Sequence, residues 1–170
     1  MPVKIIDGDL FETKANFICH QVNCQGRMRS GVAKQVREKF PVVYRHYKAW
    51  CDEDAKSRKA IGLTKSQLLG RVQVVYKEDY LVGDQNIDTQ VICNMFSQDQ
   101  YGYNGKQYTD YEAFEKCLLQ LKERVPAGET IAMPYKIGCG LGGGDWSVVL
   151  GLIERVLSND HTVELWKKEV

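Results

Sequence analysis

The segment Pro134–Trp146 reads PYKIGCGLGGGDW and carries five glycines within seven positions. A strand-like stretch precedes it, and apolar residues at helical spacing follow it as far as Leu157. Glycine lets backbone amides approach a ligand, and amides beside a helix N-terminus attract anions. The segment therefore predicts a loop, Gly138–Gly144, that binds a phosphate or pyrophosphate. The alternative interpretation is a flexible connector.

Strand-like and helix-like segments alternate outward from this loop. Periodicity predicts strands at 3–6, 15–22, 70–76, 91–96, 130–135 and 161–166, and helices at 31–40, 42–52 and 146–157. One more helix is expected to begin at Thr109, which with Glu112 forms a capping-box pattern. Residues 54–65 are charged and are predicted to be a surface connection. The alternation indicates an α/β fold with a mixed, largely parallel sheet and helices on both faces.

Composition limits the class of protein. The chain has 170 residues, 44% of them hydrophobic, and we expect one domain over 1–170. The net charge of +1 and the dispersed basic residues give no reason to predict specific nucleic-acid binding. No apolar stretch approaches the roughly 20 residues that span a bilayer, and the first residues do not resemble a secretory signal. Six scattered cysteines are typical of reduced, buried thiols. We expect a cytoplasmic monomer without cofactor or metal.

Two further loops follow strands and carry polar groups. His20–Ala33 reads HQVNCQGRMRSGVA, in which Asn23 can donate and accept hydrogen bonds as sugar hydroxyls require. Asn23 would alternatively cap a turn, and His20 would alternatively be a hydrogen-bonded core residue. After the first strand, Asp9 can accept from an amine such as that of adenine, or cap the segment that follows.

Taken together, these loops resemble the macrodomain family. The matching pieces, in order, are VKIIDGDL, ICHQVNCQGRMRSGVAKQV, VICNMFSQ and MPYKIGCGLGGGDW, and the resemblance runs from Val3 to Leu165. The chain looks most like small stand-alone macrodomains related to ADP-ribose-1″-phosphate processing proteins and terminal ADP-ribose glycohydrolases. The resemblance implies a three-layer α/β/α fold and a cleft for ADP-ribose or an ADP-ribosyl derivative.

The resemblance also assigns positions in that cleft. Asp9 and Leu10 would contact adenine, Trp166 would stack on adenine or serve the core, and Asn23 would hold the distal ribose. One phosphate loop would contain Ser30, Gly31 and Val32, and the other would contain Ile137, Gly138, Cys139, Gly140 and Leu141. Asn94 and Phe96, which close their strand, would face the same cleft.

Catalytic groups of the hydrolytic relatives are missing from this sequence. One branch has an aspartate where this chain has Ala33, and the other has an aspartate at Gly142 and a lysine after the middle strand. His20 and Asp145 remain as candidate catalytic residues, although Asp145 would alternatively be only a helix N-cap. The resemblance therefore favours hydrolysis of an ADP-ribosyl compound, of the ADP-ribose-1″-phosphate phosphatase or ADP-ribosyl hydrolase type. The alternative is a non-catalytic ADP-ribose-binding module.

Three other features have open interpretations. Cys19, His20 and Cys24 would form a zinc site only if neighbouring strand residues shared a face, which the alternation of side chains opposes. Cys139 would be a nucleophile if the helix N-terminus lowered its pKa, or a structural residue otherwise. The polar, tyrosine-rich region 97–108 would be a lid over the ligand or a surface segment.

Overall fold

The computed structural model describes residues 3–76 and 90–168. Its strands and helices, in chain order, are β1 (Val3–Asp7), a 3-10 turn η1 (Leu10–Glu12), β2 (Phe17–Val22), α1 (Gly31–Lys39), α2 (Pro41–Ile61), β3 (Val72–Val75), β4 (Val91–Phe96), α3 (Tyr111–Arg124), β5 (Thr130–Pro134), α4 (Trp146–Leu157) and β6 (Thr162–Lys167). The predicted order of elements is confirmed, with strand ends shifted by one or two residues. The end of the strand predicted at 70–76 is at Val75.

One sheet contains the six strands in the order β1-β6-β5-β2-β4-β3. Every neighbouring pair is parallel except β3 with β4. All six residues of β4 are buried, as expected for a strand covered on both faces. The mixed, largely parallel sheet is therefore confirmed, and β2 lies at its centre between β5 and β4.

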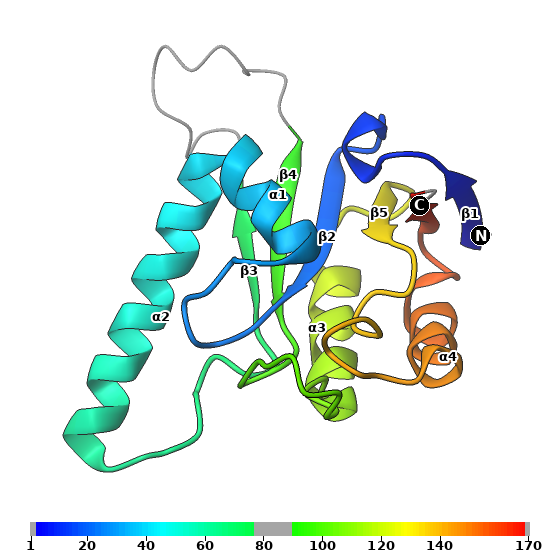
Figure 1. Cartoon of the computed structure of the whole chain (residues 1–170). Coiled ribbons are helices and arrows are strands. Elements are labelled where there is room, and N and C mark those ends of the chain that lie inside the picture. The colour runs from blue at the N-terminus through cyan, green and yellow to red at the C-terminus, as the bar shows by residue number, and fades with distance from the viewer. Residues whose placement is uncertain (1–2, 77–89, 169–170) are drawn as a thin grey trace.

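Helices cover the two faces in pairs, with α1 and α2 on one side and α3 and α4 on the other (Figure 1). Successive strand residues divide between these layers because their side chains alternate. On β2, Ile18 packs with Val36 and Val43 of the first helix pair. Cys19 packs with Phe114 and Ile153 of the second pair. The α/β/α arrangement follows from this alternation.

Two predictions of local structure are wrong. The second helix does not stop at Asp52 but continues to Ile61, so most of the predicted 54–65 connection is helical. Charged residues at helical spacing stabilise the extended part of α2, as in the Arg58–Asp54 ion pair. The helix ends before Gly62, which has φ 73°. The N-cap of α3 is Asp110, which accepts from the amide of Ala113, and Thr109 bonds elsewhere.

The cysteines are free thiols, five of them buried and Cys139 partly buried, as predicted. None of the helices in the described ranges is long and apolar enough to cross a membrane.

Candidate functional site

Two pockets lie on either side of the first turn of α1. Val32 lines the larger, of about 390 Å³, whereas Ser30 and Ala33 line the smaller, of about 100 Å³. The remaining walls of the large pocket are Gly8, Asp9, Leu10, Phe11, Gln35, Pro134, Tyr135, Lys136, Trp166, Lys167 and Lys168. Those of the small pocket are Gln21, Val22, Asn23, Arg27, Arg29, Gln98, Tyr101, Gly102, Tyr103 and Leu141. The larger volume falls in the range of ligand sites, roughly 300–1,000 Å³.

The glycine loop between β5 and α4 also contributes to both pockets. Its beginning, at Lys136, lines the large pocket, and Leu141 lines the small one. Within the described residues, the amides of Gly138, Gly140 and Leu141 donate to no protein acceptor, whereas neighbouring amides bond inside the loop. Unused amides on a glycine loop are the donors that an anion requires.

The last residue of the tyrosine-rich region, Tyr108, and the next residue, Thr109, donate hydrogen bonds to the glycine loop. The hydroxyl of Thr109 donates to the carbonyl of Gly138 at 2.6 Å. The amides of Tyr108 and Thr109 donate to the carbonyl of Gly142 at 2.7 and 2.9 Å. A Cβ at Gly142 would lie 2.5 Å from Thr109 Oγ1 and 2.7 Å from the Gly138 carbonyl. This position therefore has no room for the aspartate that the glycohydrolase branch carries.

Gln21, which the sequence analysis did not select, bonds the end of β2 to both ends of the segment between β4 and α3. Its amide nitrogen donates to Gln98 Oε1 at 2.6 Å and to Thr109 Oγ1 at 2.9 Å. Its amide oxygen accepts from Ser97 Oγ at 2.7 Å. The only signal for it in the sequence is a polar residue near the end of a central strand.

The N-terminus of α1 is not capped by its own serine. Ser30 occupies the N-cap position but makes no capping hydrogen bond with its side chain. Its hydroxyl instead lies 2.8 Å from the hydroxyl of Tyr103, across the small pocket. The first-turn amides and the helix dipole therefore remain available to an anion near Gly31.

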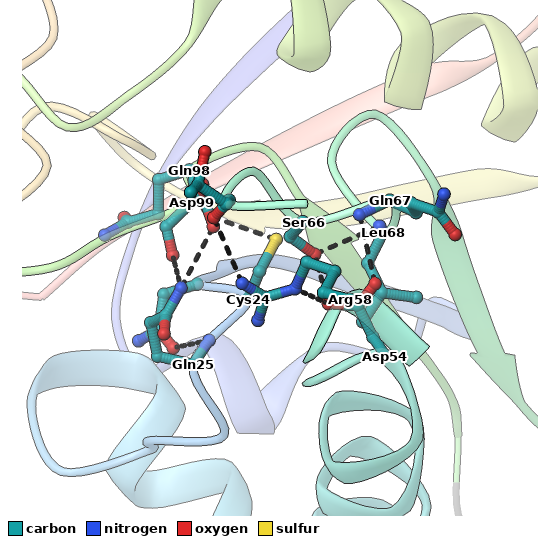
Figure 2. Close-up of polar contacts among 11 residues, drawn as sticks. Cys24, Gln25, Asp54, Arg58, Ser66, Gln67, Leu68, Gln98 and Asp99 are labelled. Atoms are coloured by element: carbon teal, nitrogen blue, oxygen red, sulfur yellow. Dashed lines mark hydrogen bonds and ion pairs between the residues drawn. The ribbon is translucent and has the colours of Figure 1, made fainter. Parts of the chain in front are cut away.

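The β2–α1 loop and the tyrosine-rich region are also joined by direct bonds, which Figure 2 shows. The amide of Cys24 donates to the carbonyl of Asp99 at 3.0 Å, and its thiol contacts the carbonyl of Gln98. The side chain of Gln25 donates to the Asp99 carboxylate at 3.0 Å. Beside this contact in Figure 2, buried Asp54 accepts from Arg58, Ser66 and the amide of Gln67. The walls of the small pocket are thus held together.

Besides Gln21, two arginines of the small pocket were not selected from the sequence, and two tyrosines were named only within the region 97–108. Arg27 and Arg29 come from the β2–α1 loop, and Tyr101 and Tyr103 come from the tyrosine-rich region. The two tyrosines are 38% and 64% exposed, so their rings are available to a ligand. The tyrosines are about seventy residues from the arginines in the chain. No local sequence motif can therefore predict that these aromatic and basic residues share a pocket. No acidic side chain is among the residues that line the pocket.

His20 lies in the interior, 1% exposed, and lines neither pocket. Its Nε2 is 2.6 Å from Asn94 Oδ1, and Asn94 in turn donates to Gln73. Burial lowers the pKa of His20 to about 4, against the smaller opposing effect of the Asn94 hydrogen bond. This geometry favours the alternative interpretation of His20, a hydrogen-bonded core residue, over a catalytic role.

The prediction that Asn94 and Phe96 face the cleft is wrong. Both side chains are fully buried, and they point from β4 toward α2. The ring of Phe96 stacks between those of Tyr47 and Trp50. The cause is the period of the strand: 92, 94 and 96 share the face that the first helix pair covers.

The other predicted residues lie at or beside the pockets. Leu10 and Trp166 line the large pocket together with Asp9, whose carboxylate also caps η1 through the amide of Phe11. Asn23 lines the small pocket, but its side chain holds the turn to Arg27 and accepts from Tyr47 and Gln25. Asn23 is therefore both a wall residue and the turn cap of the alternative interpretation.

Two reactive groups of the glycine loop are engaged structurally. Asp145 caps α4 by accepting from the hydroxyl and the amide of Ser147, and these bonds lower its pKa. Burial raises the pKa of the Cys139 thiol, which opposes its use as a nucleophile. Neither Asp145 nor Cys139 lines either pocket.

Comparisons with known proteins agree with this geometry. No protein-family model matches the chain. It is 33% identical over 165 residues to an uncharacterised 17.5 kDa protein of phage T4, covering 91% of this chain and 89% of the relative. It is 25% identical over 173 residues to an ADP-ribose 1″-phosphate phosphatase of Debaryomyces hansenii, covering 90% and 93% of the two chains.

A third relative is a DNA ADP-ribosyl transferase–DNA ADP-ribosyl glycohydrolase fusion protein of Thermosipho africanus, 26% identical over 162 residues. The match covers 92% of this chain but spans only 39% of the fusion protein. Among solved structures, the macrodomain of Thermus aquaticus DarG superposes with a TM-score of 0.69 at 25% identity, covering 99% of each chain. The Thermosipho DarTG structure, solved with ADP-ribose, superposes with a TM-score of 0.68 at 23% identity over 96% of this chain and 41% of its own. This chain belongs to the macrodomain family.

Proposed function

We propose that this protein binds ADP-ribose, with adenosine in the large pocket, the distal ribose in the small pocket and the pyrophosphate between them. The observation that carries the proposal is that two backbone segments with amides free to donate each line both pockets. Val32 and Ser30 do so from the first turn of α1, and Lys136 and Leu141 do so from the glycine loop.

The large pocket has the chemistry that adenine requires. Trp166 presents an aromatic surface whose Nε1 donates to Glu164 at 3.0 Å, which fixes the ring. Leu10 and Phe11 supply apolar surface. The carboxylate of Asp9 uses one oxygen for Phe11, and the second would accept from an exocyclic amine.

The pyrophosphate would lie between the amides of the glycine loop and the start of α1. Charged phosphate oxygens accept strong hydrogen bonds from backbone amides, and the helix dipole adds positive potential. Tyr108 and Thr109 donate hydrogen bonds to the carbonyls of Gly138 and Gly142. The amide donors of the glycine loop are therefore already oriented. Preorganisation of this kind reduces the entropy lost on binding.

Calorimetric titration tests the proposal. The protein is expected to bind ADP-ribose more tightly than AMP, because AMP leaves the small pocket empty. The Gly142→Asp variant, which places a side chain where none fits, is expected to lose binding. Absence of ADP-ribose binding to the wild-type protein, or equal affinity for ADP-ribose and AMP, would contradict the proposal.

A second candidate function is hydrolysis of the group attached to the distal ribose. The names of the Debaryomyces and Thermosipho relatives favour it. No carboxylate lines the small pocket, and burial keeps His20 neutral at pH 7. The chain's own contribution would therefore be to hold the pyrophosphate and orient the distal ribose, with stabilisation of the departing charge by loop amides.

The small pocket combines Arg27 and Arg29 with two tyrosines, which favours a carrier with negative charge and flat rings. ADP-ribosylated single-stranded DNA is therefore the first substrate to assay, beside ADP-ribose-1″-phosphate and an ADP-ribosylated protein. Release of ADP-ribose or of phosphate would establish hydrolysis. Tight binding of ADP-ribose without any turnover would instead establish the non-catalytic module.

A further inference from the structure

Three lysines stand at the rim of the large pocket. They are Lys136, Lys167 and Lys168. The ammonium groups of Lys136 and Lys167 lie 5.9 and 5.3 Å from the centre of one ring, that of Tyr135. Within the described residues, none of the three forms an ion pair. Positive charge is thus concentrated here without a carboxylate partner.

The acidic content of the pocket does not balance this charge. Asp9 is the one acidic residue among the pocket's lining, and its Oδ1 accepts from the amide of Phe11. Two ammonium groups near one ring repel each other, and the ring itself offsets only part of that cost. An anion placed between them would stabilise the arrangement.

The backbone directs Lys136 to this place. It has φ 59°, and it is the one non-glycine residue with positive φ in the described chain. A long side chain seldom adopts this conformation. This conformation lies between the end of β5 at Pro134 and the glycines that begin at Gly138.

In the proposed binding mode, Lys136 lies beside the ribose of the adenosine. A molecule that runs from the Trp166 wall to the amides of the glycine loop passes Lys136 with the ribose of its adenosine. The hydroxyl groups at C2′ and C3′ are the only positions of that ribose open to substitution. Resting on the proposed function, we propose that the large pocket takes ADP-ribosyl ligands with a phosphate monoester on the adenosine ribose, bound by these three lysines.

The chemistry of the group suits lysine. A phosphate monoester carries up to two negative charges and three acceptor oxygens, and ammonium groups bind it as mobile point charges. The rim is exposed, so salt is expected to weaken this contact more than it weakens the amide contacts to the pyrophosphate. Ligands phosphorylated at C2′ or at C3′ share this chemistry and are distinguished by testing both.

Calorimetry with three ligands provides the test: ADP-ribose, 2′-phospho-ADP-ribose and 3′-phospho-ADP-ribose. The readout is the ratio of each phosphorylated ligand's affinity to that of ADP-ribose in the same protein, at low and high ionic strength. The variant Lys136→Asn/Lys167→Gln removes two rim charges, and asparagine tolerates the left-handed backbone. The control Lys56→Gln/Lys59→Gln removes two exposed charges from α2.

The wild-type protein and the control are expected to bind one of the phosphorylated ligands about tenfold more tightly than ADP-ribose at low salt. The ratio should fall toward one in the rim variant and at high salt. Equal affinities in the wild-type protein, or a ratio that the rim variant preserves, would overturn the proposal while ADP-ribose binding stands. Failure of all three ligands to bind would overturn the proposed function itself, and this proposal with it.

Discussion

The two pockets differ in how the chain builds them. The walls of the large pocket come mainly from the ends of β1, β5 and β6, where the sheet fixes the positions of residues such as Asp9, Pro134 and Trp166. The small pocket is built mainly from loops, and the Ser30–Tyr103 hydrogen bond between two of them crosses it. Rigid strand ends suit the adenosine that all ADP-ribosyl ligands share. The loops suit the variable group at the distal ribose.

Adding a side chain at Gly142 of the glycine loop should have the largest effect on stability and on ligand binding. The Gly142→Ala variant places a Cβ against Thr109, the Gly138 carbonyl and Gln21 at 2.5–2.9 Å, so the loop must move. We expect unfolding free energy to fall by roughly 3 kcal/mol, with loss of ADP-ribose binding. In the control Gly140→Ala, the Cβ meets nothing within 4 Å, and stability should change by less than about 0.5 kcal/mol. Equal behaviour of the two variants in urea unfolding would show that the packing is misplaced.

The assignment of His20 to the core rather than to the small pocket predicts a pH effect of similar size. Its folded-state pKa of about 4 lies below the 6.5 of an ordinary histidine, so the unfolded chain takes up the proton first. Stability from neutral His20 is complete above pH 6.5 and is lost as the pH falls from 6.5 to 4, by about 3 kcal/mol.

Urea unfolding of the wild-type protein and of His20→Gln at pH 7 and pH 4 measures this loss. Other titrating groups are common to both proteins, so the difference between their pH dependences isolates His20. A wild-type protein that loses no more stability than the variant would place His20 in contact with solvent.

Removing the aromatic wall of the large pocket should weaken every ligand that contains adenosine. Trp166→Ala is expected to cost about 2 kcal/mol, roughly 30-fold, for ADP-ribose and for AMP alike. Trp50→Ala removes a tryptophan of α2 that lines neither pocket, and serves as the control. A loss for ADP-ribose without a loss for AMP would mean that adenosine does not occupy this pocket.

The smallest predicted effect belongs to the hydrogen bond across the small pocket. Tyr103→Phe keeps the ring and removes its bond to Ser30, so the tyrosine-rich region should be held less firmly over the distal ribose. ADP-ribose affinity is expected to fall by about 1 kcal/mol, roughly fivefold, with AMP affinity unchanged. Parallel losses for the two ligands would remove the distinction between the pockets.

The sequence predicted the large pocket better than the small one. The resemblance assigned Asp9, Leu10 and Trp166 to one site, and all three line the large pocket, at or just beyond strand ends on one edge of the sheet. The glycine loop was identified because its composition serves a backbone function that few other loops need.

The small pocket could not be predicted in the same way, because it depends on contacts between segments that are distant in the sequence. Tyr101 and Tyr103 come into one pocket with Arg27 and Arg29 because bonds such as Cys24–Asp99 and Ser30–Tyr103 join their two loops, and no periodicity reveals those bonds. Asn94, Phe96 and His20 were placed near the cleft from their position along the strands. The side of the sheet to which each residue points decided their place instead.

Backbone NMR during a titration with ADP-ribose tests the central claim most directly. The amides of Gly31, Val32, Gly140 and Leu141 are predicted to shift together, because the pyrophosphate would accept hydrogen bonds from both segments at once. Adenosine alone should shift signals around Asp9–Phe11 and Trp166 and leave those four in place. An ADP-ribose titration that moves only the adenosine end, or that moves none of these signals, would contradict a single site spanning the two pockets.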